Sequence, residues 1–206
     1  MASKFYKFAR GLVKPFVWGI FRVKVLGKEN LDYTGRMIMA SNHRGLLDTL
    51  LIACDIQHKL RPMAKKELFE SKLGNKLFTA LGAFPIDRGK GDIGAIRAAG
   101  KVLQEGGTLI VFPEGTRNRD KKEWSLMEFK NGTSLIAIRN DTAILPVCIA
   151  TIPKAFRKNY VVFGKPISYQ DVMDPELDKS ENTRRLTKAV QQSVQQMHDM
   201  VMEKYY

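Results

Sequence analysis

The stretch GGTLIVFPEGTR, residues 106–117, decides the fold that this sequence encodes. Its two leading glycines end a helical pattern, and residues 108–112 form a continuous apolar run typical of a strand buried on both faces. Gly115 then allows a sharp backbone turn between a carboxylate, Glu114, and a guanidinium, Arg117. We therefore place this strand at the centre of a sheet, with both charged groups at the edge where α/β proteins bind ligands.

Short strand-like runs alternate with helical patterns along the rest of the chain, which is the rhythm of an α/β domain. Besides the central strand, we predict strands at residues 23–26, 37–41, 84–86, 143–150 and 160–163. We predict helices at residues 67–80 (with a break near Gly74), 92–105, 133–140 and 182–204. Pro146 is expected to mark the edge or end of its strand. Residues 23–206 are thus predicted to form one α/β domain with a mixed, largely parallel central sheet flanked by helices.

Composition and charge narrow the classes of function. The 206 residues are 44% hydrophobic and 27% charged, which fits one globular domain with a sizeable core. A net charge of +13 indicates an anionic partner, and both nucleic acid and an anionic membrane satisfy it. No RNA-binding aromatic motif, zinc-finger spacing or basic recognition helix supports nucleic acid. Cys54 and Cys148 lie far apart without metal-ligand spacing, which favours a reducing, cytoplasmic compartment and no metal site.

The first 22 residues combine aromatic and aliphatic side chains with basic ones and contain no acid. Lys14 and Pro15 are expected to split this segment into two pieces, each too short to span a bilayer. We interpret residues 1–22 as an amphipathic helical anchor at the membrane interface, although a terminal helix packed on its own domain or a partner helix has the same composition. The expected anchor residues are Lys4, Phe5, Lys7, Phe8, Arg10, Lys14, Phe16, Trp18 and Phe21.

The segment NHRGLLD, residues 42–48, follows the predicted strand 37–41. Five positions separate His43 from Asp48, and at about 100° per residue these two side chains do not share a helical face. With the histidine in the turn and the aspartate in the first helical turn, however, the carboxylate can reach back to one ring nitrogen and leave the other free to take a proton. Alone, this spacing favours a pair that merely caps a helix, so the hypothesis of a catalytic base needs neighbouring groups.

Further charged groups follow other predicted strands. Arg88 comes just after the short strand of GAFPIDR, and Arg117 follows the central strand, where it could grip a phosphate with paired donors. Lys65, in the segment MAKKEL, precedes a predicted helix start whose free N–H groups also favour an anion. Each of these groups alone would be an ordinary solvated charge.

Four motifs in this order, NHRGLLD, GAFPIDR, FPEGTR and LPV, resemble those of the 1-acyl-sn-glycerol-3-phosphate acyltransferases. The resemblance runs from about residue 35 to residue 165 and includes KKEL and EFKNGT. It implies that His43 is the catalytic base and Asp48 its partner. It also implies that the glycerol phosphate is held by Arg88, Glu114, Gly115 and Arg117, and we add Lys65 and Thr116 to this predicted site. Gly45 departs from the serine that many members carry in the first motif.

The resemblance and the residues together lead us to expect an acyltransferase at the cytoplasmic face of the cell membrane, peripheral or monotopic. The expected donor is acyl-ACP or acyl-CoA, the expected acceptor is the 2-hydroxyl of lysophosphatidate at an anionic membrane surface, and no cofactor is required. We expect direct transfer without an acyl-enzyme, because neither cysteine belongs to a motif beside His43. Glycerol 3-phosphate or another lysophospholipid remains open as the acceptor, and a basic nucleic-acid-binding protein or a catalytically silent membrane scaffold as the other classes.

Overall fold

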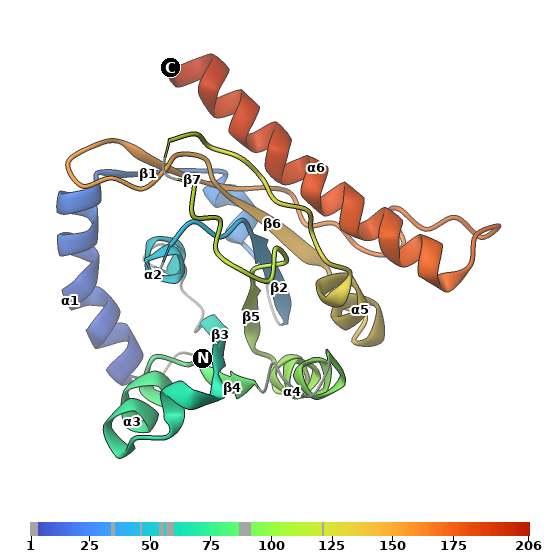
Figure 1. The fold of residues 1–206 in the computed structure, drawn as a ribbon, viewed down its shortest axis with the longest axis horizontal. Helices are drawn as coiled ribbons and strands as arrows, with labels where there is room; N and C mark the ends of the chain where they lie inside the picture. Colours follow the sequence, from blue (N-terminus) through green and yellow to red (C-terminus); the bar gives the residue numbers. More distant parts are fainter. Residues whose placement is uncertain are drawn as a thin grey trace.

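A computed structural model describes residues 4–33, 36–45, 47–53, 56, 60–86, 92–120 and 122–206 (Figure 1). The strands are β1 (Val23–Leu26), β2 (Met37–Ser41), β3 (Leu60–Lys65), β4 (Phe84–Ile86), β5 (Thr108–Val111), β6 (Ile144–Ile149) and β7 (Asn159–Phe163). The helices are α1 (Lys4–Phe21), α2 (Asp48–Ala53), α3 (Lys72–Ala80), α4 (Asp92–Gln104), α5 (Gly132–Arg139) and α6 (Lys179–Tyr205), with 3-10 turns η1 (Lys28–Leu31) and η2 (Lys66–Phe69).

All seven strands form one sheet in the order β1-β7-β6-β2-β5-β3-β4. Within the described chain, the β6–β7 pair is antiparallel and the other neighbouring pairs are parallel. The prediction of a mixed, largely parallel sheet is therefore confirmed. β5 is an interior strand as predicted, although the middle position belongs to β2, all of whose residues are buried.

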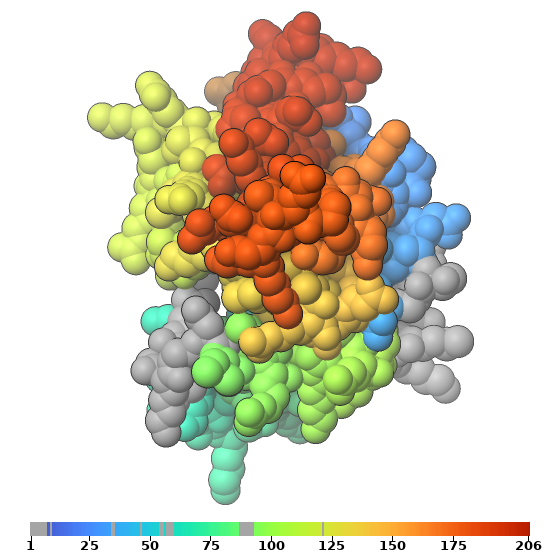
Figure 2. All heavy atoms as spheres, turned by 90° about the vertical axis from the view of Figure 1, so that its right-hand side faces the viewer, coloured from blue at the N-terminus to red at the C-terminus, as the bar shows by residue number. Residues whose placement is uncertain are grey.

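Alternating side chains of the central strand feed two hydrophobic cores, one on each face of the sheet. Ile38 and Ala40 belong to the core covered by α4, α5 and α6, whereas Met37 and Met39 belong to the core that includes residues of α1 and α2. Helix α6 buries one apolar stripe, formed by Leu186, Val190, Val194, Met197 and Val201. Figure 2 shows α6, in red and orange, lying across the surface of its side of the molecule. On α4, Ile96 and Leu103 are buried, whereas Ile93 is 67% exposed.

The prediction that Pro146 marks the edge or end of a strand is wrong. It is a buried residue inside β6, which lies between β7 and β2. The missing N–H faces the β7 side, since Ile144, two residues earlier, exchanges backbone hydrogen bonds with Ile167 on that side. There the carbonyl of Pro146 still accepts from the Gly164 N–H at 2.8 Å, just after β7 has ended. The proline therefore interrupts no pairing within the ladder.

Helix α1 continues through Pro15, so the expectation of two separate pieces is also wrong. The hydrogen bond that a proline removes here is the one to the carbonyl of Gly11. Because Gly11 is exposed, that carbonyl remains open to solvent and the helix tolerates the loss. Among the described residues, no helix has the length and low charge needed to cross a bilayer.

Residues 60–80 differ most from the prediction. Strand β3 was not predicted, because LRPMAK shows neither a continuous apolar run nor a clean alternation. The predicted helix is divided into η2 and α3, and the break lies before Gly74, at Ser71, whose side chain caps α3 by accepting from the Gly74 N–H. Gly74 is needed within the helix, since a Cβ there would lie 2.5 Å from the carbonyl oxygen of Leu68.

Candidate active site

The site is built where β2 and β5 end side by side at the same edge of the sheet. Asn42, the first residue after β2, is fully buried and joins this strand to β6. Its side-chain amide donates to the carbonyl of Ile149 at 3.0 Å, and its oxygen accepts from the Ile149 N–H at 2.8 Å. This pair extends the β2–β6 connection by one residue and fixes the point from which His43 emerges. The sequence reasoning assigned Asn42 no role.

The carboxylate of Asp48, at the start of α2, organises the turn that follows. It is fully buried, and its Oδ2 accepts hydrogen bonds from His43 Nδ1 at 2.7 Å, from the Gly45 N–H at 2.8 Å and from the Arg44 N–H. The structure thus brings His43 and Asp48 together as their spacing predicts. Because Nδ1–H points at the carboxylate, Nε2 is the ring nitrogen left to accept a proton.

The ring of His43 is also fixed from its flat side. Phe112, which follows β5, stacks on it with the ring centroids 4.0 Å apart and the planes inclined by 17°. The histidine side chain remains 21% exposed, which leaves the ring accessible to a substrate. Sequence reasoning treated Phe112 only as the last apolar residue of the strand, and a stacked partner has no signature of its own in the sequence.

Glu114 contacts the main chain of His43. It is 2% exposed, and its Oε1 accepts from the His43 N–H at 3.0 Å, while the Asn118 N–H donates to the His43 carbonyl at 2.8 Å. Burial raises the pKa of Glu114 to about 7, although the hydrogen bond from His43 acts in the opposite direction. We expected Glu114 to help hold the glycerol phosphate. In the described structure its Oε1 contacts the backbone of the histidine loop, and Glu114 is not among the described residues that line the cavity. A contact with the acceptor stays a prediction.

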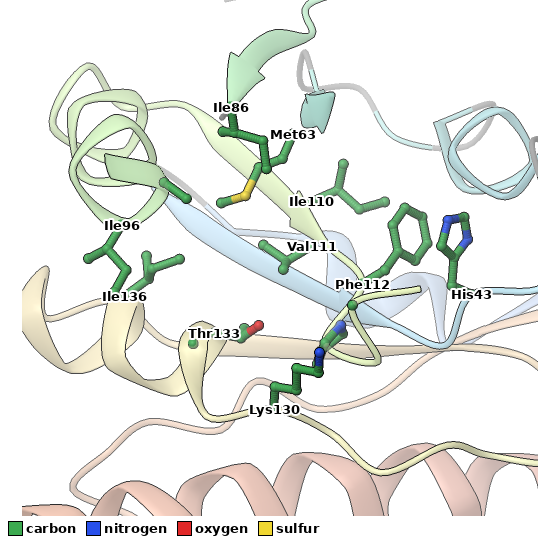
Figure 3. Close-up of a pocket in the computed structure, with 14 residues that line it drawn as sticks. His43, Met63, Ile86, Ile96, Ile110, Val111, Phe112, Lys130, Thr133 and Ile136 are labelled. Atoms are coloured by element: carbon green, nitrogen blue, oxygen red, sulfur yellow. The ribbon is translucent and has the colours of Figure 1, made fainter. Parts of the chain in front are cut away.

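A cavity of about 290 Å³ opens beside His43 (Figure 3). Most of its lining is apolar and comes from the strands β3, β4 and β5 and the helices α4 and α5. Figure 3 shows His43 and Phe112 at one end and Ile86, Ile96 and Ile136 toward the other. The described lining residues are His43, Met63, Ile86, Ala95, Ile96, Ile110, Val111, Phe112, Pro113, Gly115, Lys130, Gly132, Thr133 and Ile136. The cavity can accept an apolar chain whose polar end lies at the histidine.

Lys130 contributes the cation of this lining, and the sequence reasoning gave it no role. Its N–H donates to the carbonyl of Pro113 at 3.0 Å, which holds it against the turn after β5. Gly115 in that turn has a φ of 74°, and a Cβ added there would lie 3.0 Å from the Lys130 ammonium nitrogen. The glycine therefore provides both the left-handed backbone and the space for the lysine. The EFKNGT segment was the available signal for Lys130.

Three of the remaining predicted phosphate ligands are described, and they lie near this site without lining its cavity. Thr116 and Arg117 are exposed in the turn after β5, and Lys65 is exposed as the last residue of β3. Since β2, β3 and β5 run parallel, all three lie at the same edge of the sheet as His43. Arg88 lies outside the described residues.

The predicted anchor residues on α1 divide into two groups. Phe8 and Phe16 are 70% and 66% exposed, whereas Trp18 and Phe21 are partly buried and pack against the core. Arg10 donates a hydrogen bond to the carbonyl of Ile56, and the ammonium of Lys14 lies 4.6 Å from the centre of the Trp18 ring. The side chains of Lys4, Phe5 and Lys7 lie outside the described part of the chain.

The structure combines an α/β sheet, a histidine–carboxylate pair at the carboxyl ends of its strands and an apolar cavity beside that pair, an arrangement compatible with an enzyme. The protein-family model described as "Acyltransferase" matches residues 22–150, so the chain belongs to the acyltransferase family.

The relatives agree with this assignment. A 1-acyl-sn-glycerol-3-phosphate acyltransferase of Bacillus subtilis (strain 168) is 27% identical over 200 residues, which cover 94% of this chain and 97% of the relative. An enzyme of the same name from Borreliella burgdorferi is 29% identical over 178 residues, 82% of this chain and 67% of the relative. The crystal structure of the 1-acyl-sn-glycerophosphate acyltransferase of Thermotoga maritima covers 98% of this chain and 80% of its own, with a TM-score of 0.74 and 24% identity. That likeness shows the fold.

Gly45→Ser should give a more stable protein than Gly45→Ala. Within the described structure, Asp48 Oδ1 is buried without a hydrogen-bond partner, and a Cβ at Gly45 would lie 3.8 Å from it. A serine hydroxyl there can donate to that oxygen, so Gly45→Ser should exceed Gly45→Ala in free energy of unfolding by about 1–2 kcal/mol. Urea unfolding of the two variants measures the difference, and equal stabilities would show that the hydroxyl does not reach the carboxylate.

Glu114→Gln should alter the pH dependence of stability. The pKa of Glu114 is about 7 in the folded protein against an ordinary value of 4.5, so the folded state favours the protonated acid. Its contribution to stability is therefore complete below about pH 4.5 and is lost as the pH rises to about 7. The free energy of unfolding of Glu114→Gln minus that of the parent should be larger at pH 8 than at pH 5. Unfolding curves at the two pH values test this, and a stability difference independent of pH would contradict the raised pKa.

Proposed function

We propose that this chain is a 1-acylglycerol-3-phosphate O-acyltransferase. It moves a fatty acyl chain from acyl-ACP or acyl-CoA to the 2-hydroxyl of 1-acyl-sn-glycerol 3-phosphate and so makes phosphatidic acid. Membership of the acyltransferase family and the names of the relatives support this acceptor. The observation that carries the proposal is the His43 ring, held by Asp48 at 2.7 Å and lining an apolar cavity.

In the proposed mechanism, His43 Nε2 removes the proton from the 2-hydroxyl as its oxygen attacks the thioester carbonyl carbon. The new carbon–oxygen bond gives a tetrahedral oxyanion, which collapses by breaking the carbon–sulfur bond. The leaving thiolate then takes the proton back from the imidazolium, which the Asp48 carboxylate stabilises in the meantime. One proton and one acyl group are exchanged, and the enzyme returns to its starting state.

Direct transfer is supported by the surroundings of the histidine. In the part of the chain that the structure describes, the ring of His43 contacts the Asp48 carboxylate and the face of Phe112 rather than a serine or cysteine. Cys148 is fully buried in β6, and burial raises the pKa of its thiol well above the ordinary value. It is therefore a poor nucleophile, and the acyl group passes directly to the acceptor oxygen.

The polar and apolar parts of the two substrates have matching surroundings. Arg117 and Lys65 supply positive charge for the acceptor phosphate, and a guanidinium suits its paired oxygens. The Thr116 hydroxyl lies beside Arg117 in the same turn. Arg88, which is outside the described residues, stays a further predicted ligand. Lys130 adds positive charge within the cavity beside Gly115. The apolar lining formed by side chains such as Met63, Ile96 and Ile136 receives an acyl chain, whose methylenes gain free energy by leaving water.

The exposed face of α1 supports the membrane-interface segment at residues 1–22. Leu12 and Phe16 are 59% and 66% exposed, while Val17 on another face of the helix is buried in the core. The helix is thus attached to its domain by one face and presents apolar side chains on the other. With a net charge of +13, an anionic membrane is the partner that satisfies both features, and the cytoplasmic face is where the acceptor and donor meet.

The experiment that tests the reaction is an assay of the purified chain. Thioesters of acyl carrier protein and of coenzyme A, with several chain lengths, are each offered with lysophosphatidate and with glycerol 3-phosphate. We expect phosphatidic acid from lysophosphatidate. His43→Ala should lower kcat by at least about 100-fold, because the general base is lost, while its melting temperature stays close to that of the parent. Full activity in a folded His43→Ala variant would exclude the proposed base.

Phe16→Glu should weaken binding to anionic vesicles by about tenfold or more, since a charge would replace an apolar side chain that enters the interface. Phe16→Leu, which keeps the position apolar, is the matched control and should bind nearly as the parent does. Sedimentation with vesicles of phosphatidylglycerol measures both. If the two variants bound equally, α1 would not be the anchor.

A further inference from the structure

The loop that joins β6 to β7, residues 150–158, exposes a phenylalanine at its tip. Phe156 is 73% exposed, and its backbone has a φ of 61°. A bulky side chain in the left-handed region is strained, and such strain persists only where the surroundings impose it. An apolar ring held on the surface by an unfavourable backbone requires an explanation beyond packing of the core.

The surroundings that impose this shape are visible in the hydrogen bonds of the loop. Asn159, 1% exposed, donates to the carbonyls of Lys154 at 2.8 Å and Arg157 at 3.0 Å, and it accepts from the Lys154 N–H at 2.9 Å. The same amide reaches the carbonyl of Phe21 in α1. The buried asparagine therefore holds the loop closed and ties it to the end of that helix.

The backbone of Phe156 is hydrogen-bonded to α1, next to a stripe of exposed apolar side chains on that helix. Its N–H donates to the carbonyl of Ile20 at 2.6 Å. Figure 1 draws this loop, in orange, just above the end of α1 that leads into β1. The exposed side chains of α1 recur every fourth residue, which places them on one face of the helix. They are Phe8, Leu12, Phe16 and Ile20, so Phe156 adjoins the last member of the stripe.

The charges around Phe156 identify the partner. Lys154, Arg157 and Lys158 are exposed, and residues 150–158 contain no acid. Protein interfaces are depleted in lysine, whereas lysine beside an apolar side chain suits a membrane, where the ring enters the interface and the ammonium meets anionic headgroups. An anionic bilayer therefore fits this loop better than a protein surface does.

The loop also lies at the catalytic edge of the sheet. β6 runs parallel to β2, so the carboxyl ends of both strands point the same way, one leading to His43 and the other to this loop. Because β7 is antiparallel to β6, the chain returns from the loop at the same edge. A bilayer that contacts Phe156 thus faces the end of the sheet that carries the histidine.

We propose that the β6–β7 loop is a second membrane-contacting element, in which Phe156 enters the headgroup region of an anionic leaflet. Together with the stripe on α1 it gives two points of attachment and so turns the edge that carries His43 toward the membrane. The orientation role rests on the proposed function, in which the acceptor is a lipid, but the contact itself does not.

The test uses the full chain and sedimentation with vesicles of phosphatidylglycerol and phosphatidylcholine. Phe156→Ala should bind phosphatidylglycerol vesicles about tenfold more weakly than the parent, and Phe156→Leu should recover most of the loss. Met173→Ala is the matched control, because Met173 is 42% exposed in the loop after β7. That loop follows the opposite edge of the sheet, and Figure 1 shows the chain leading into α6 on the right, whereas α1 lies on the left. The control should bind like the parent.

Depth of insertion gives an independent readout. Phe156→Trp should show quenching by lipids brominated on their acyl chains beyond that of Trp18 and Trp124 in the parent. Met173→Trp should show no such addition. Unchanged vesicle binding in a folded Phe156→Ala variant, or no added quenching in Phe156→Trp, would overturn the proposal. Normal vesicle binding combined with weaker binding of a soluble acidic carrier protein would reassign the loop to a protein partner.

Activity on acceptor dispersed in detergent separates this inference from the proposed function. Phe156→Ala should retain the parent rate there, since the change lies outside the catalytic groups, and should lose rate when the acceptor is presented in phosphatidylglycerol vesicles. A parent without transferase activity, whose vesicle binding still depends on Phe156, would end the proposed function and leave the membrane contact standing. A fully active parent whose vesicle binding does not depend on Phe156 would end the proposed membrane contact and leave the proposed function standing.

Discussion

The need to satisfy one buried carboxylate controls the geometry of the candidate site. A charge removed from water is tolerated only where hydrogen-bond donors replace the solvent. The Oδ2 atom of Asp48 meets this requirement with donors supplied by three consecutive residues, His43, Arg44 and Gly45, so the chain after β2 must wrap around this oxygen. The orientation of the histidine ring follows from that wrapping. Glu114 accepts from the His43 N–H and Phe112 stacks on the His43 ring. Residues that follow the two adjacent strands β2 and β5 therefore hold the histidine together.

The sequence could predict those elements whose own composition determines them. The apolar runs of β2 and β5 have no stable place except inside a sheet, and the stripe of α6 has a single way to be buried. β3 escaped prediction because its residues LRPMAK are placed by their neighbours on both sides rather than by a pattern of their own. Pro146 was wrongly predicted to lie at the edge or end of its strand. Its missing N–H faces the β7 side, where the β6–β7 pairing covers only residues 147–149, so no ladder hydrogen bond is lost.

The contact between His43 and Asp48 was predictable from the sequence, but the contacts of the neighbouring groups were not. Residue types and order indicated a base, a partner carboxylate and cations for phosphate. Whether a carboxylate faces the substrate or its own chain depends on backbone geometry, and Glu114 turned out to accept from the main chain of His43. Lys130 was missed for a related reason: a lysine in a loop is ordinarily solvated, and only the space left by Gly115 brings its ammonium beside the cavity.

The reversal of direction between β6 and β7 has a consequence for how such an enzyme can diversify. A crossover connection would carry the chain to the far edge of the sheet and back, so any change in its length would disturb helix packing. A hairpin leaves and re-enters at one edge, with both stems fixed by the sheet and by Asn159. Its tip can therefore lengthen, shorten or change charge while the register of every strand is kept. Under the proposed membrane contact, adaptation of the loop to lipids of different composition is uncoupled from the chemistry of acyl transfer.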